Sequence, residues 1–237
     1  MIRVGTAGWT IPCRVAEHFP SPGSGLERYT ARFNCAEINS TFYRPHKPAT
    51  FERWAASVPE HFRFAVKVPR AITHERRLVG PELLLDDFLS QVSPLGAKLG
   101  PLLVQLPPSL VLDANIAAGF FGAVRQRFDG RLVCEPRHAS WFTPEADALL
   151  QQGRIARVAA NPARVPEAAQ PGGWPGLVYH RLHGSARIYY SEYGADVIEA
   201  LADQLGSAGR EAWCIFDNTV SGAAAANALA LIERLSA

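Results

Sequence analysis

Short apolar runs rich in β-branched and aromatic residues recur along the chain, and segments with apolar residues at three- and four-residue spacing separate them. The first pattern is typical of buried strands, and the second of helices that cover a sheet. Strands are predicted at residues 2–7, 35–39, 62–68, 102–106, 132–135, 155–160, 177–182 and 213–216. Helices are predicted at residues 50–57, 81–98, 114–128, 144–152, 195–205 and 223–235.

This alternation predicts an α/β fold with a parallel sheet, and eight strand–helix units predict closure into a single (β/α)8 TIM-type barrel. An open doubly wound sheet is the alternative, but no G-x-G-x-x-G follows the first apolar run. The chain has 237 residues, close to the roughly 250 that such a barrel needs, so a single domain is expected over residues 1–237.

Two segments break the alternation. Residues 161–176 (NPARVPEAAQPGGWPG) contain several prolines and a Gly-Gly pair, which disfavour a helix. The sixth helix is therefore expected to be degenerate or replaced by a loop. Residues 11–25 are also rich in proline and glycine, and predict a loop before a short first helix.

Composition indicates the cellular compartment of the protein more clearly than its function. The net charge of +2 gives no general attraction to nucleic acid or to a membrane. The four cysteines include no C-x-x-C pair, so free thiols in a reducing compartment are expected. No leader-like segment and no long apolar run is seen, which predicts a cytoplasmic protein without membrane contact. The oligomeric state is not indicated.

Polar side chains recur where the predicted strands end, and the C-terminal strand ends are where TIM barrels carry their chemistry. Alternation along each strand predicts that the side chains of one parity point into the barrel mouth, and residues just past a strand end lie beside them. They are Glu37, Asn39, Lys67, Gln105, Glu135, Arg137, Arg181, His183, Asp217 and Asn218. The loops that follow are expected to add Tyr43, His74 and Trp141 to the substrate-binding residues.

A structural ion network is the alternative interpretation of this ring, because its three acids match its basic residues in number. The position at the mouth favours a functional role. No cofactor is predicted. No H-E-x-x-H is present, but a divalent metal held by ligands from distant strands stays open.

The strand-end segments as a set resemble the YecE-like family. They are GTAGW (5–9), EINSTFYR (37–44), FRFAVKVPRAITH (62–74), LGPLLVQLPPS (99–109), EPRHASWF (135–142), RLHG (181–184) and FDNT with G-x-x-x-x-NAL (216–229). The resemblance runs from residue 2 to about 235 and implies a TIM-type barrel of unknown function. The family commonly has an aromatic residue where Pro136 stands and often an asparagine where Asp217 stands. Its barrels are similar to those of endonuclease IV and the xylose isomerases, an analogy of fold alone.

Three functions remain open. The first is an enzyme, such as a hydrolase, acting on an anionic, phosphate-bearing substrate, with nucleic acid among the candidates. Lys67, Arg137 and Arg181 would hold the phosphate, with Glu135 or Glu37 as general base and His183 as general acid. The second is a glycoside hydrolase using Glu37 and Glu135, although strands two and five lie far apart around the ring. The third is a non-catalytic nucleic-acid-binding protein.

Overall fold

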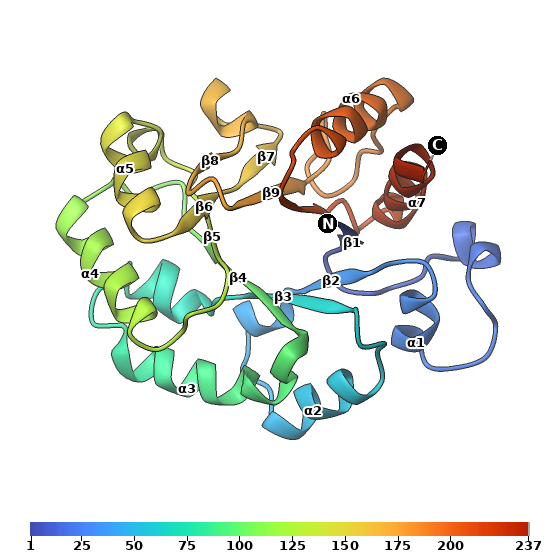
Figure 1. Ribbon diagram of the computed structural model, residues 1–237, viewed down its shortest axis with the longest axis horizontal. Coiled ribbons are helices and arrows are strands. Elements are labelled where there is room, and N and C mark those ends of the chain that lie inside the picture. Colours follow the sequence, from blue (N-terminus) through green and yellow to red (C-terminus); the bar gives the residue numbers. More distant parts are fainter. Residues whose placement is uncertain (237) are drawn as a thin grey trace.

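Parallel strands form a ring at the centre of the structure, and the α-helices lie around its outside (Figure 1). This computed structural model describes residues 1–236. The strands are β1 (Ile2–Thr6), β2 (Cys35–Ile38), β3 (Arg63–Lys67), β4 (Leu99–Gln105), β5 (Leu132–Glu135), β6 (Ile155–Arg157), β7 (Ala159–Asn161), β8 (Gly172–Gly173), β9 (Leu177–Leu182) and β10 (Glu211–Phe216). The helices are α1 (Gly25–Thr30), α2 (Pro48–Ala56), α3 (Glu82–Val92), α4 (Ala114–Arg125), α5 (Pro144–Gln152), α6 (Ala195–Gly206) and α7 (Ala223–Ser236).

Two hydrogen-bonded arcs close into the barrel. One arc has the order β1-β10-β9-β7 and the other β2-β3-β4-β5-β6-β8, with every pair parallel except β6 and β8. The Gly8 N–H donates to the Glu37 carbonyl (2.8 Å) and joins β1 to β2. On the opposite side, β6 pairs with β5 of the second arc and β7 pairs with β9 of the first arc. Because β7 follows β6 directly along the chain, these two strands join the arcs there. The predicted α/β barrel of TIM type is confirmed.

The sixth strand has no α-helix after it, as predicted from the prolines. Residues 162–176 hold a 3-10 turn (Pro166–Ala169) and the short β8, and in Figure 1 this segment separates α5 from α6. The helix predicted over 81–98 is shorter in the structure, because α3 ends at Val92. A 3-10 segment, Ser93–Lys98, follows it and contains Gly96, whose φ is 53°. The expected loop over 11–25 contains a 3-10 turn, Cys13–His18.

Alternation along the strands divides the core into two apolar layers. Side chains on one parity fill the barrel interior: Cys35, Ala65, Leu103, Val133, Tyr179, Trp213 and Ile215. Those on the other parity, such as Ile38, Val66 and Cys134, pack under the helices. The next interior position on each strand therefore points to the mouth.

Within residues 1–236, no helix has both the length and the apolar character needed to cross a membrane.

Candidate functional site

The interior of the barrel changes from apolar to charged toward the C-terminal strand ends. Two residues beyond the interior apolar positions Cys35, Ala65, Leu103, Val133 and Tyr179 stand polar side chains that are also buried. These are Glu37, Lys67, Gln105, Glu135 and Arg181. The strand register fixes this layer, because these parallel strands bring their last interior positions to the same end of the barrel. The sequence-predicted ring of polar residues is therefore a contiguous layer across the barrel.

Arg181 of β9 is the centre of this layer and is completely buried. Its Nε and Nη2 donate to the two carboxylate oxygens of Glu37, at 3.1 and 2.7 Å. Its Nη1 donates to Glu135 Oε2 (2.5 Å) and its Nη2 also donates to Asp217 Oδ2 (3.0 Å). One planar guanidinium thus holds three acids from three different strands, a geometry that a lysine ammonium does not offer.

Glu37 lies at the bottom of this network. It is completely buried, and the Tyr179 hydroxyl donates to its Oε2 (2.8 Å) beside the Arg181 Nε–H. Burial raises the pKa of Tyr179, and contact with the Glu37 carboxylate raises it further. All the hydrogen bonds to Glu37 come from side chains beneath or beside it, so it is a structural acid rather than one that faces solvent.

Glu135 and His183 form the upper edge of the network. Glu135 accepts from Gln105 Nε2 (3.1 Å) and Arg137 Nε (3.1 Å) as well as from Arg181. Burial alone would raise its pKa, but Arg181, His183 and Arg137 hold the pKa well below its usual range. A carboxylate with this many donors is a weak base.

Both ring nitrogens of His183 face carboxylates: Nδ1 lies 3.0 Å from Asp217 Oδ2, and Nε2 lies 3.1 Å from Glu135 Oε1. Two acceptors favour the doubly protonated ring, in which both nitrogens are donors. Burial lowers the pKa of His183, but Glu135 and Asp217 outweigh it and the pKa is raised. The imidazolium of His183 is therefore a buried cation that carries protons on both sides.

Lys67 completes the layer in a different way. It keeps 6% of its surface exposed, and its ammonium lies 4.0 Å from the centre of the Phe42 ring. Burial, reinforced by the Arg181 guanidinium, lowers the pKa of Lys67 to about 8. Beside it, burial together with the charges of Lys67 and Arg137 lowers the pKa of His74 to about 4. His74 is therefore neutral at pH 7.

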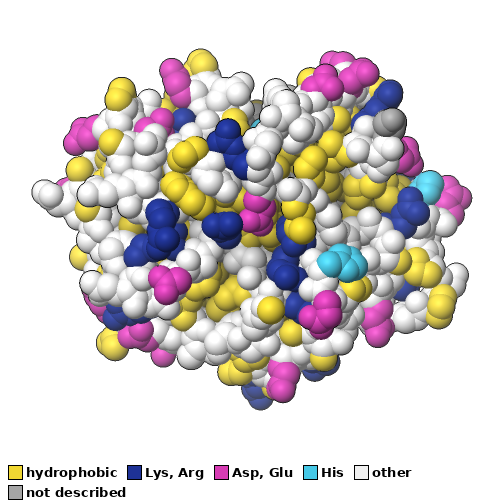
Figure 2. Space-filling view, viewed as in Figure 1, with side chains coloured by type: hydrophobic (Ala, Val, Ile, Leu, Met, Phe, Trp, Pro, Cys, Tyr) yellow, Lys and Arg dark blue, Asp and Glu magenta, His cyan; other side chains and the backbone are white. Residues whose placement is uncertain are grey.

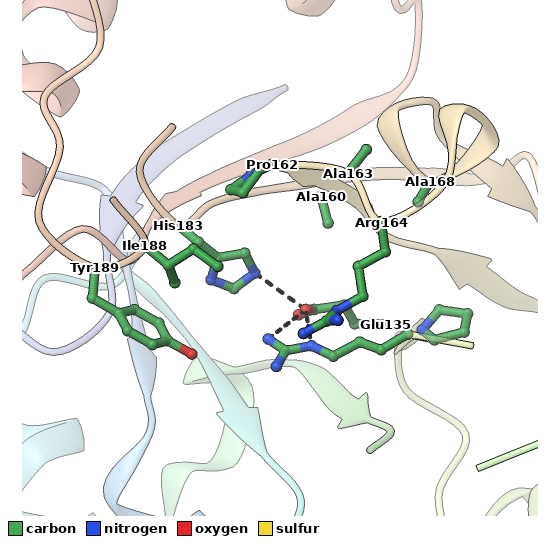
Figure 3. A pocket seen from close by; sticks show the side chains of 11 residues that line it. Glu135, Ala160, Pro162, Ala163, Arg164, Ala168, His183, Ile188 and Tyr189 are labelled. Carbon is green, nitrogen blue, oxygen red and sulfur yellow. Dashed lines mark hydrogen bonds and ion pairs between the residues drawn. The ribbon is translucent and has the colours of Figure 1, made fainter. Parts of the chain in front are cut away.

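A pocket of about 390 Å³ opens above the upper edge of the network. We call it the mouth pocket, and define it by Glu135, Arg137, Arg164, His183, Ile188 and Tyr189. In Figure 3 the side chains of Arg164, His183 and Tyr189 converge from different segments on Glu135 at the pocket floor. The loop that replaces the sixth helix forms one wall, with Pro162, Ala163, Arg164 and Ala168.

Positive charge exceeds negative charge around the mouth pocket. The carboxylates of Glu37, Glu135 and Asp217 are balanced by Arg181, Arg137 and the His183 imidazolium. Lys67 of the polar layer and Arg164 of the pocket wall remain, and neither side chain has a hydrogen-bond or ion-pair partner within residues 1–236. Figure 2 shows the same character on the surface, with Lys and Arg side chains around a small acidic patch near the middle of the face.

Three residues predicted for the site lie elsewhere. Trp141 is buried, and its Nε1 donates to the Leu110 carbonyl (2.9 Å) beside a separate cavity. Asn218 is buried and donates to the Ser191 carbonyl (2.8 Å), which ties β10 to the preceding loop. Tyr43 is 72% exposed and lines a second cavity. The remaining predicted residues belong to the layer or touch it, as Asn39 does through its Nδ2, which lies 3.4 Å from Asp217 Oδ1.

Tyr179, Arg164 and Tyr189 are functional candidates that the strand-end argument did not select. Tyr179 shares the parity of Arg181, so the alternation along β9 carried a signal for it. Arg164 and Tyr189 come from the loops after β7 and β9, where no periodicity predicts which way a side chain points. Within residues 1–236, no group of three or more His, Cys, Asp and Glu side chains is arranged to hold a metal ion.

Comparison with known proteins agrees with the fold. The "UPF0759 protein YecE" of Escherichia coli K12 is 36% identical over 107 residues, 45% of this chain and 38% of YecE. The "UPF0759 protein YunF" of Bacillus subtilis is 27% identical over 150 residues, 61% of this chain and 53% of YunF. The matched part of the chain thus spans about half or less of these relatives.

Solved structures match over the whole chain. A DUF72 family protein from Thermotoga maritima MSB8 superposes with a TM-score of 0.81 at 25% identity, covering 100% of both chains. One from Enterococcus faecalis V583 has a TM-score of 0.83 at 23% identity, covering 100% of this chain and 96% of its own. A D-psicose 3-epimerase shares the fold alone, with a TM-score of 0.53 at 11% identity, over 89% of this chain and 90% of its own. Residues 3–237 match the family described as "Protein of unknown function DUF72", and the chain therefore belongs to the DUF72 family.

Proposed function

We propose that the protein is an enzyme that acts on a small, anionic, phosphate-bearing substrate in the mouth pocket. The observation that carries this proposal is the excess of positive charge at the pocket. After the three acids are paired, Arg164 in the pocket wall is left over, and so is Lys67 in the polar layer that contains Glu135. Unpaired cations in a partly desolvated site attract an anion more strongly than they would in water.

The roles differ from residue to residue. Arg137 and Arg164 offer two planar guanidinium groups for the phosphate, and bidentate contacts to phosphate are the geometry that arginine favours. His183 lines the pocket and is assigned the role of proton donor, with the Nε2–H held on Glu135 Oε1 until a substrate oxygen replaces that acceptor. Glu135 positions Arg137 and His183 rather than taking a proton, because its pKa is held well below the usual range.

The size of the pocket favours a small molecule over a nucleic-acid duplex. Its volume of about 390 Å³ falls at the lower end of the range for small-ligand sites. Binding to nucleic acid without catalysis remains the alternative, and it predicts affinity for oligonucleotides that falls steeply with salt.

Glycoside hydrolysis is less well supported. Glu37 and Glu135 lie closer than the strand positions led us to expect, because both contact Arg181. Two carboxylates that share one guanidinium are close enough for their separation not to exclude glycosidase chemistry. However, the guanidinium fills the space that a sugar ring would need, and Glu37 has no exposed surface.

Titration calorimetry with inorganic phosphate and with a panel of phosphate monoesters tests the proposal. Arg164→Gln should weaken binding by roughly 10- to 100-fold, because a hydrogen bond to a charged group contributes about 1.5–3 kcal/mol. This variant leaves the buried network intact, since Arg164 pairs with none of its acids. Arg32→Gln is the matched control: Arg32 is also exposed, but it precedes β2 at the opposite end of the barrel. Unchanged phosphate binding in Arg164→Gln, or no binding by the native protein, refutes the proposal.

A further inference from the structure

The chain uses lysine at only three positions, Lys47, Lys67 and Lys98, and arginine at all its other Lys and Arg positions. Lys98 has a structural role, because its Nζ donates to the Ala55 and Val58 carbonyls at 2.9 and 2.7 Å. Lys47 is exposed at the start of α2. Lys67 alone is buried without a hydrogen-bond acceptor within residues 1–236. No ion pair therefore explains its presence in the mouth, and its Nζ is not among the fully buried atoms without a partner, so it keeps a small accessible surface.

Burial lowers the pKa of Lys67 to about 8, so a larger share of this side chain is neutral amine than of an exposed lysine. Its side chain lies against the Phe42 ring, and the nearby acids are already engaged by Arg181. Desolvation and a neighbouring cation are the two conditions under which proteins keep a lysine amine unprotonated and nucleophilic. An arginine at this position would stay charged, whereas a lysine can lose its proton.

Lys67 belongs to the same polar layer as Glu135, which lines the mouth pocket. His74 is close enough to both Lys67 and Arg137 for each charge to affect it. Arg137 lines the same pocket, and its guanidinium is suited to an anion. A ligand with a phosphate on Arg137 and a carbonyl a few bonds away would bring its carbonyl carbon toward Lys67.

We propose that Lys67 is a nucleophile that captures the carbonyl group of a phosphate-bearing aldehyde or ketone as an imine. The lone pair of the neutral amine adds to the carbonyl carbon, and one N–H proton moves to the oxygen to give a carbinolamine. Loss of the hydroxyl group and of the second N–H proton as one water molecule then forms the C=N bond. The step needs no oxidant or reductant. The choice of a phosphate-bearing partner rests on the proposed function, but the reactivity of the amine does not.

Reductive trapping tests the inference. The native protein is incubated with pyridoxal 5′-phosphate, reduced with cyanoborohydride, and mapped by peptide mass spectrometry over the three lysines and the N-terminal amine. We expect Lys67 to be labelled at least 10-fold faster than Lys47. The rate at Lys67 should rise with pH around a midpoint near 8, because burial lowers the pKa of Lys67 to about 8. Non-specific labelling predicts the reverse order, because Lys47 is the exposed residue.

Variants and a second aldehyde separate the two parts of the inference. Lys67→Arg keeps the positive charge but forms no imine, so labelling at this position should disappear while Lys47→Arg leaves it unchanged. Pyridoxal, which lacks the phosphate, should label Lys67 more slowly than pyridoxal 5′-phosphate. Equal rates would support the amine but overturn the phosphate-bearing substrate, together with the proposed function. Preferential labelling of Lys47 by both aldehydes overturns the inference while leaving phosphate binding, measured separately, as it is.

Discussion

Replacing Arg181 by methionine removes the one side chain among residues 1–236 that contacts Glu37, Glu135 and Asp217 together. Glu135 and Asp217 would still contact His183. Glu37 would keep only the Tyr179 hydroxyl, and would become a completely buried carboxylate without a cation. Breaking a buried pair in this way costs about 3–5 kcal/mol. Since domains unfold with a free energy of about 5–15 kcal/mol, this is a large part of the total.

Urea unfolding followed by circular dichroism measures the loss in the free energy of unfolding directly. In thermal unfolding of a chain of this size, each kcal/mol lowers the melting temperature by about 2–4 °C, so a decrease of roughly 6–20 °C is expected in Arg181→Met. Adding Glu37→Gln to Arg181→Met should recover at least about 1 kcal/mol, because the amide removes the unpaired charge and still accepts from Tyr179.

The pH dependence has a defined sign. In the native protein the folded-state pKa values of Glu135 and Asp217 are lowered, so their contribution is complete above about pH 4.5, near the unfolded pKa values. It is lost as the pH falls through the folded-state values. Without Arg181 the carboxyl groups become easier to protonate, so the difference in stability between Arg181→Met and the native protein should narrow from pH 7 to pH 4. Two results would refute this prediction. One is a loss in the free energy of unfolding below about 1 kcal/mol for Arg181→Met at pH 7. The other is a double variant whose loss equals the sum of the losses of Arg181→Met and Glu37→Gln.

Two further predictions concern a titration and a close contact. The pKa of His183 is raised, so its stabilising contribution is complete below about pH 6.5 and is lost as the pH rises through the folded-state pKa. Asp217→Asn should lower the pKa of His183 in an NMR titration. An unchanged titration would contradict the assignment. Gly5→Ala places a Cβ 2.1 Å from the backbone oxygen of Cys35, so thermal unfolding should show a loss of about 1–3 kcal/mol or more. Gly119→Ala in α4 is the control, since its Cβ meets no atom within 4 Å and the change should be neutral or stabilising by up to about 1 kcal/mol.

The periodicity of the sequence was sufficient for the fold, because strands and helices repeat a local pattern that needs no long-range information. The loss of the sixth helix followed in the same way from the prolines of residues 161–176. The inward direction of Glu37, Lys67 and Arg181 was also predictable, since alternation along a strand fixes the face on which a side chain lies. The end of α3 at Val92 was missed, because a helical apolar spacing continues past it into the 3-10 turn.

Tertiary structure alone decided how the charged residues pair. Nothing in the spacing of Glu37, Glu135 and Asp217 indicates that one guanidinium would contact all three, because that depends on the stagger of strands far apart in the sequence. The same stagger left Lys67 without an acid and brought Arg164 over the mouth from a loop whose course has no periodic signal. The sequence therefore determined which residues reach the mouth of this barrel, through local periodicity. The folded chain determined which of them are neutralised and which keep a free charge or amine, because pairing is a matter of distances across the ring.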